Sequence, residues 1–75
     1  MKFERISIDP KIMTGKPCIK GTRITVELLL GRLGEGASME WILTGYPNIT
    51  REDILEAILY AKAVVSLQEI EEVAA

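Results

Sequence analysis

The sequence offers no disulfide or metal cross-link, here called a staple, that could stabilise a small core. Its 75 residues include one cysteine and no histidine, so neither an internal disulfide nor a zinc or iron site is expected. A domain of this size buries roughly 60% of the surface that its unfolded chain exposes, and it often relies on a staple or a partner. We therefore expect residues 1–75 to form a single domain without metal or cofactor, supported by self-association.

The missing histidine also counts against an enzyme. It removes the imidazole base of a conventional Ser/His or Cys/His nucleophile. Carboxylate chemistry would need a pocket, which so small a core rarely encloses. The chain contains no apolar run of about 18 residues that could span a membrane, and its first five residues, MKFER, lack the apolar segment of a secretion signal. We expect a non-catalytic, cytoplasmic protein that does not bind membranes.

The charged residues are unevenly distributed along the chain. Residues 1–24 carry six bases and two acids, a net charge of +4, whereas residues 25–75 carry three bases and nine acids, a net charge of −6. The two segments together give the total of −2. Such asymmetry indicates a basic surface that could meet phosphate and an acidic surface that could meet a basic partner. The alternative is that these charges only solvate exposed positions.

Short strands and a basic turn are expected in residues 1–25. Ile6 and Ile8 alternate with polar residues until Pro10 ends the run. A tight turn at Lys20 and Gly21 joins two further short runs, 18–19 and 22–25. Because an isolated two-stranded hairpin is marginal in water, we expect these strands of three to five residues to pair with helices or with strands of a second copy.

Three helices are expected after this β element. Thr25 caps the first, over 26–33, and Ser38 caps the second, over 39–44. The third begins at Thr50, where Asp53 completes a capping box. Residues 26–63 should form the helical core, and 64–75 a C-terminal helical extension. The predicted fold is mainly α, with a three-helix, helix-turn-helix-like core and a short N-terminal β element.

The third helix has one apolar face more than a small domain can cover. One face, expected to meet the core, contains Ile54, Ile58, Ala61 and Val65. The other, the predicted partner-binding set, contains Tyr60, Ala63, Leu67, Ile70 and Ala74. Two alternatives remain: the helix breaks at Ser66, which forms a second capping box with Glu69, or its tail is frayed.

The start of the third helix is poorly suited to reading DNA bases. In a helix-turn-helix protein this part of the last helix enters the major groove, but here one cation, Arg51, stands against the three carboxylates of Glu52, Asp53 and Glu56. If DNA is bound, the basic segment 16–23 and Arg51 should contact phosphate, with Thr50 as a possible base contact. The predicted nucleic-acid-binding residues are Lys16, Lys20, Thr22, Arg23, Thr50 and Arg51.

Several of these residues have a structural interpretation beside the functional one. The Thr22 hydroxyl could close the turn, and Arg23 could bond backbone carbonyls or the carboxylates of a neighbouring helix. Cys18 is expected to be a small buried hydrophobe rather than a reactive thiol. Trp41 and Tyr46 are expected to anchor the core or a dimer interface.

An ordered set of short motifs resembles a known family. It consists of GKPCIKGTRITV at 15–26, GAS at 36–38, IL at 42–43, YP at 46–47 and TREDI at 50–54. Together these motifs resemble the domain-of-unknown-function family 433 over residues 3–63. The resemblance implies a helix-turn-helix-like core of the homeodomain-like or winged-helix-like kind. It also implies a homodimeric, cytosolic antitoxin that neutralises a PIN-like ribonuclease toxin and regulates its own operator DNA.

Two functional hypotheses follow. The first is a non-catalytic, antitoxin-like regulator that binds its toxin through the C-terminal segment and binds DNA as a dimer through the basic turn. The second is a protein-interaction module whose core has the helix-turn-helix shape but no nucleic-acid role. The acidic start of the third helix favours the second hypothesis.

Overall fold

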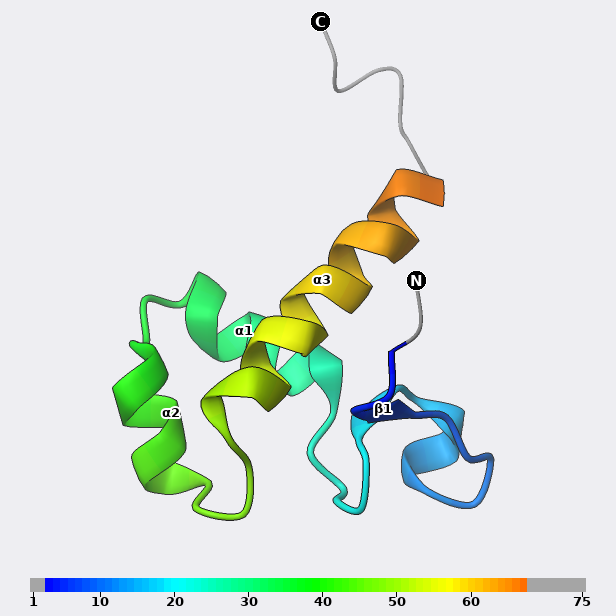
Figure 1. Cartoon of the computed structure of the whole chain (residues 1–75), viewed down its shortest axis with the longest axis horizontal. Helices are drawn as coiled ribbons and strands as arrows, with labels where there is room; N and C mark the ends of the chain where they lie inside the picture. The colour runs from blue at the N-terminus through cyan, green and yellow to red at the C-terminus, as the bar shows by residue number, and fades with distance from the viewer. Residues whose placement is uncertain (1–2, 68–75) are drawn as a thin grey trace, which may run out of the picture.

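The structure is a computed structural model that describes residues 3–67, and over that range the protein is mainly α (Figure 1). A short β element precedes three helices, as predicted. In chain order the elements are β1 (Ile6–Ser7), the 3-10 turn η1 (Met13–Gly15), β2 (Cys18–Ile19), α1 (Val26–Gly34), α2 (Met39–Gly45) and α3 (Arg51–Leu67). In these described residues no helix is long and apolar enough to cross a membrane.

All three helices begin at the residues whose side chains cap them. The Thr25 hydroxyl accepts a hydrogen bond from the Leu28 amide at 3.0 Å, and the Ser38 hydroxyl accepts one from the Trp41 amide at 3.0 Å. At α3 the Thr50 hydroxyl accepts from the Asp53 amide at 3.2 Å, and the Asp53 carboxylate accepts from the Thr50 amide at 2.9 Å. The predicted capping box is therefore confirmed.

The β element is shorter than expected and closes on itself. β1 pairs antiparallel with β2, Ile6 opposite Ile19, so each of these strands of two residues has a partner strand within the chain. The turn after β2 explains the short length. There the Thr22 hydroxyl donates to the Ile19 carbonyl at 2.8 Å and accepts from the Ile24 amide at 3.0 Å, while Gly21 adopts a φ of +80°. A side chain thus occupies backbone groups that a longer ladder would use.

The core lies where α1, α2 and α3 meet the β element. Its buried hydrophobic residues come from β2, the turn after it, all three helices and the connection before α3: Ile19, Ile24, Val26, Leu29, Ile42, Ile49, Ile54 and Ala57. Beside them Cys18 is buried with a free thiol, as predicted. Tyr46 is half-buried and packs against this core.

The face that α3 turns to the core differs from the predicted one. Ile54 is fully buried and Ala57 joins it, whereas Ile58 and Val65 are 36% and 67% exposed. Ile58 lies about 100° around the helix from Ala57, so only one of the two can face α1 closely. The small Ala57 takes that place. The prediction of a core face through Ile58 and Val65 was therefore wrong, although Ala61 does pack against the core.

Trp41 does not belong to the core. Its side chain is 59% exposed, because the next residue, Ile42, is the one that α2 turns inward and buries completely. The alternative of a break at Ser66 is tested only as far as Leu67, where α3 and the described residues end: up to there the helix is unbroken, and the Ser66 hydroxyl donates to the Lys62 carbonyl at 2.8 Å. A hydroxyl that bonds one turn back is typical of a helix interior.

Candidate partner-binding surface

The side of α3 turned away from the core carries aliphatic side chains in contact with solvent. Leu55, Ile58 and Leu59 are all exposed, and with Lys62 they follow one stripe at helical spacing. We call these four residues the outer α3 face. The sequence signal that could have revealed it is ILEAIL at 54–59, which is apolar on nearly every side of the helix.

The C-terminal half of α3 extends beyond the other elements, as Figure 1 shows. Val65 and Leu67 are exposed there. Next to the outer α3 face is a hollow of about 380 Å³ lined by Phe3, Leu59, Lys62, Ala63 and Ser66. Because much of this helix contacts no other element among residues 3–67, α3 presents more apolar surface than the described part of the chain covers.

The predicted partner-binding set is divided by the structure. Tyr60 is half-buried, packs against the core and meets the Phe3 ring edge to face, with centroids 5.3 Å apart. Ala63 is half-buried at the hollow beside the outer α3 face, and Leu67 is exposed. Ile70 and Ala74 lie outside the described residues. The set is therefore not one continuous seam within the described chain.

A second apolar groove runs between α1 and α3. Its volume is about 300 Å³, and it is open to solvent along the C-terminal half of α3. Eight residues line it: Pro17, Val26, Glu27, Leu30, Tyr60, Ala61, Val64 and Val65. A groove of this chemistry can receive the apolar side of a helix or strand from another protein.

Of the six predicted nucleic-acid-binding residues, three have side chains that bond other groups of the protein, and three make no ion pair within the described residues. Lys16 pairs with Glu27 at 3.0 Å, and the hydroxyls of Thr22 and Thr50 are used within the turn and the α3 cap. The exposed Lys20, Arg23 and Arg51 make no ion pair within residues 3–67. In Figure 1 the 20–24 turn and the 46–50 connection both reach the lower edge of the view.

Two of the three carboxylates at the start of α3 bind the N-terminal segment. Arg5 Nη1 lies 3.2 Å from Asp53 Oδ1, and the Arg5 amide donates to the Glu56 carboxylate. Asp53 is therefore engaged at both oxygens, by Arg5 and by the Thr50 amide. The three carboxylates at the start of α3 therefore count less against DNA binding by this helix than the sequence suggested. The aliphatic outer α3 face is still unsuited to a DNA groove, which is flanked by charged phosphates.

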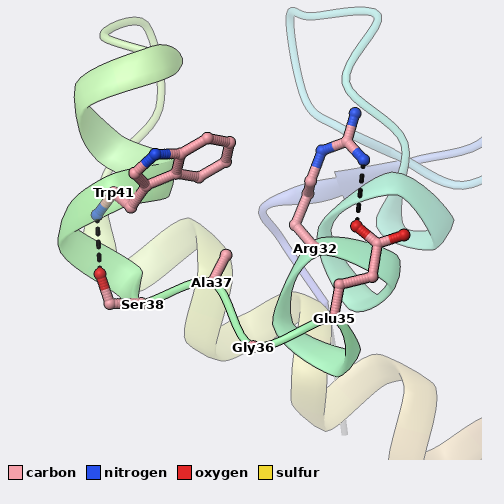
Figure 2. A pocket seen from close by; sticks show the side chains of 6 residues that line it. All are labelled: Arg32, Glu35, Gly36, Ala37, Ser38 and Trp41. Atoms are coloured by element: carbon pink, nitrogen blue, oxygen red, sulfur yellow. Dashed lines mark hydrogen bonds and ion pairs between the residues drawn. The ribbon is translucent and has the colours of Figure 1, made fainter.

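A hollow of about 540 Å³ lies between the end of α1 and the start of α2 (Figure 2). Trp41 and Arg32 stand on its opposite sides, and the segment 35–38 crosses between them. Arg32 Nη1 lies 3.3 Å from Glu35 Oε1. Within residues 3–67 no cluster of three or more His, Cys, Asp or Glu side chains is placed to hold a metal ion.

Comparison with known proteins gives this arrangement relatives but no established activity. The chain is 33% identical to the uncharacterized protein y4eO of Sinorhizobium fredii over 60 residues, which are 80% of this chain but only 27% of that protein. The crystal structure of a DUF433 member protein from Anabaena variabilis superposes with a TM-score of 0.79 and 31% identity, over 95% of this chain and 69% of the other. The family model for the protein of unknown function DUF433 matches residues 6–61. This chain belongs to the DUF433 family.

Proposed function

We propose that this protein is a non-catalytic, antitoxin-like regulator that binds a partner protein through the outer α3 face. The observation that carries the proposal is the row of exposed aliphatic residues, Leu55, Ile58 and Leu59, on the helix that extends beyond the domain. Burying such residues against another protein removes apolar surface from water, which is the main driving force of association.

The partner proposed from the family resemblance is a PIN-like ribonuclease toxin in the cytoplasm. The groove between α1 and α3, lined in part by Val64 and Val65, is a separate apolar surface that shares no lining residue with the outer α3 face. A partner that also covered this groove would make a larger contact. The net charge of −6 over residues 25–75 favours a basic partner, and a protein that binds RNA needs a basic surface. The proposed regulator would cover that surface and so block the nuclease.

Replacing Leu55 and Leu59 together with glutamate should weaken the complex at least about hundredfold, because hot-spot residues at an interface centre carry most of its affinity. Both side chains are exposed, so the variant should remain folded. The measurement is the dissociation constant for the PIN-like ribonuclease proposed as the partner, together with rescue of growth when that ribonuclease is produced.

The matched control is Ile8→Glu, an exposed aliphatic residue in the N-terminal segment rather than on α3. It should bind the ribonuclease as the unchanged chain does. Equal affinity of the Leu55/Leu59 variant would contradict the proposed surface. A neighbouring gene for some other class of protein would leave the surface to be tested on that partner, and would contradict the toxin assignment.

A second candidate function is binding of operator DNA by a homodimer. What favours it is the exposed, ion-pair-free position of Lys20 and Arg23 within the described chain. Two copies would double this basic surface, and the contacts would be to phosphate rather than to bases.

Replacing Lys20 and Arg23 with alanine should lower the dependence of log affinity on log salt concentration by about two, because each lost phosphate contact releases roughly one fewer counterion. The measurement is fluorescence anisotropy with the neighbouring operator at several salt concentrations. Lys11→Ala, an exposed lysine outside the turn, is the control and should keep the slope. If the double variant also keeps it, phosphate is not contacted by this turn.

A further inference from the structure

We propose that the hollow between α1 and α2 is a second protein-binding site, which accepts an arginine side chain of a partner. It is separate from the outer α3 face and does not depend on the function proposed for that face. The hollow has a volume of about 540 Å³ and is lined by Arg32, Glu35, Gly36, Ala37, Ser38 and Trp41. Figure 2 shows the indole of Trp41 on one side and the Arg32–Glu35 pair on the other.

Trp41 gives the hollow a site for a cation. It is the only tryptophan of the chain and its side chain is 59% exposed, while its neighbour Ile42 satisfies the packing of α2. The fold therefore does not need the indole for its core. An indole face is the best partner that a protein side chain offers to a guanidinium or ammonium group, and tryptophan is enriched among the residues that dominate binding.

The charges around the hollow favour a cation over an anion. The charged side chains nearest the hollow are one base, Arg32, and two acids, Glu35 in the lining and Glu40 beside Trp41, with a net charge of −1. Glu27 is not among them, because it lines the groove between α1 and α3 and pairs with Lys16. The carbonyl end of α1 and the amide end of α2 meet at the hollow, so the effects of their dipoles offset each other. The net charge of the side chains near the hollow is then the main electrostatic effect, and because it is negative it disfavours binding of a phosphate group.

The Arg32–Glu35 pair shows how the incoming group would be held. Arg32 Nη1 bonds only one carboxylate oxygen, Oε1, at 3.3 Å, and the two side chains are 39% and 69% exposed. An exposed pair of this kind is weak, so a second guanidinium can take the carboxylate in its place. Arginine fits better than lysine because its planar group can stack on the indole while two of its N–H groups bond the Glu35 carboxylate.

The test uses the full chain, labelled with ¹⁵N, and the blocked peptide acetyl-Gly-Arg-Gly-amide. Titration should shift the single indole N–H signal, that of Trp41, together with the Gly36 amide. The matched peptide with citrulline in place of arginine has the same shape without the charge, and it should bind at least about tenfold more weakly. Equal binding of the two peptides would overturn the proposal.

Three variants separate the roles of the lining residues. Trp41→Ala and Glu35→Gln should each weaken binding by roughly five- to tenfold, followed at the Gly36 amide. Arg32→Ala should bind the peptide at least as tightly as the unchanged chain, because it removes the competing guanidinium. All three side chains lie at the surface, and unchanged spectra elsewhere would establish that the fold is kept.

Other occupants would give different results. Loss of binding in Arg32→Ala, with shifts induced by adenosine monophosphate instead of the peptide, would make the hollow an anion site and overturn the proposal. Self-association in sedimentation experiments without peptide, removed by Trp41→Ala, would assign the hollow to a second copy and overturn it as well.

Discussion

Replacing Ile54 with alanine is expected to destabilise the protein by about 2–5 kcal/mol, the usual cost of emptying a fully buried aliphatic site. Ile54 is 0% exposed and belongs to the cluster that joins α3 to α1 and α2. A domain of this length has a total stability of about 4–11 kcal/mol. The variant should therefore lose a large part of its stability, as measured by urea denaturation followed by circular dichroism.

The matched control is Ile58→Ala, which makes the same chemical change one turn further along the same helix. Ile58 is on the outer α3 face and 36% exposed, so its loss should cost less than about 1 kcal/mol. Similar losses at both positions would contradict the orientation of α3 seen in the structure. They would instead restore the core face suggested by the spacing of Ile54, Ile58, Ala61 and Val65.

Helix starts could be predicted from sequence because their causes are local. Thr25, Ser38 and Thr50 each bond an amide three residues on, so the signal and the structure lie within one turn. The antiparallel pairing of Ile6 with Ile19 was not predictable, since it joins two short runs that are well separated in the sequence and carry no local signal for each other. The fold class followed from local signals, whereas strand length and pairing did not.

The orientation of α3 escaped prediction for a different reason. Residues 54–59 are apolar around most of the helix, so periodicity alone does not select the buried side. Two contacts from distant parts of the chain select it: Arg5 bonds Asp53 and Glu56, and Phe3 packs on Tyr60. For the same reason the outer α3 face was missed as a candidate site, and Tyr60, predicted to bind a partner, is half-buried against Phe3 and the core.

Trp41 illustrates the limit of reasoning from residue type. Large aromatic residues are usually highly buried, which made a core or interface role the natural prediction. The structure decides against the core because Ile42, not Trp41, points inward. An aromatic residue left outside by the fold is unused binding surface, and it is this property that the arginine titration probes.

Replacing Asp53 with alanine should destabilise the protein by about 2 kcal/mol. The carboxylate caps α3 through the Thr50 amide, a bond whose loss costs about 1 kcal/mol, and its other oxygen pairs with Arg5. The Arg5 side chain is 45% exposed, so solvent screens the pair and its share is about 0–1 kcal/mol. Asp53 is itself nearly buried, so the amide it leaves behind adds to the cost.

Asp53→Asn separates the two roles, since an amide oxygen can still cap the helix while the charge that attracts Arg5 is gone. It should lose about half as much stability as Asp53→Ala. A double-mutant cycle with Arg5→Ala then measures the pair itself, by denaturation in urea. A coupling near zero would mean that β1 is held to α3 by packing and the Glu56 bond alone. A coupling of about 1 kcal/mol would mean that Asp53 has a structural role and that Arg5 neutralises its charge. Asp53 should then not be counted among the carboxylates at the start of α3 that repel nucleic acid.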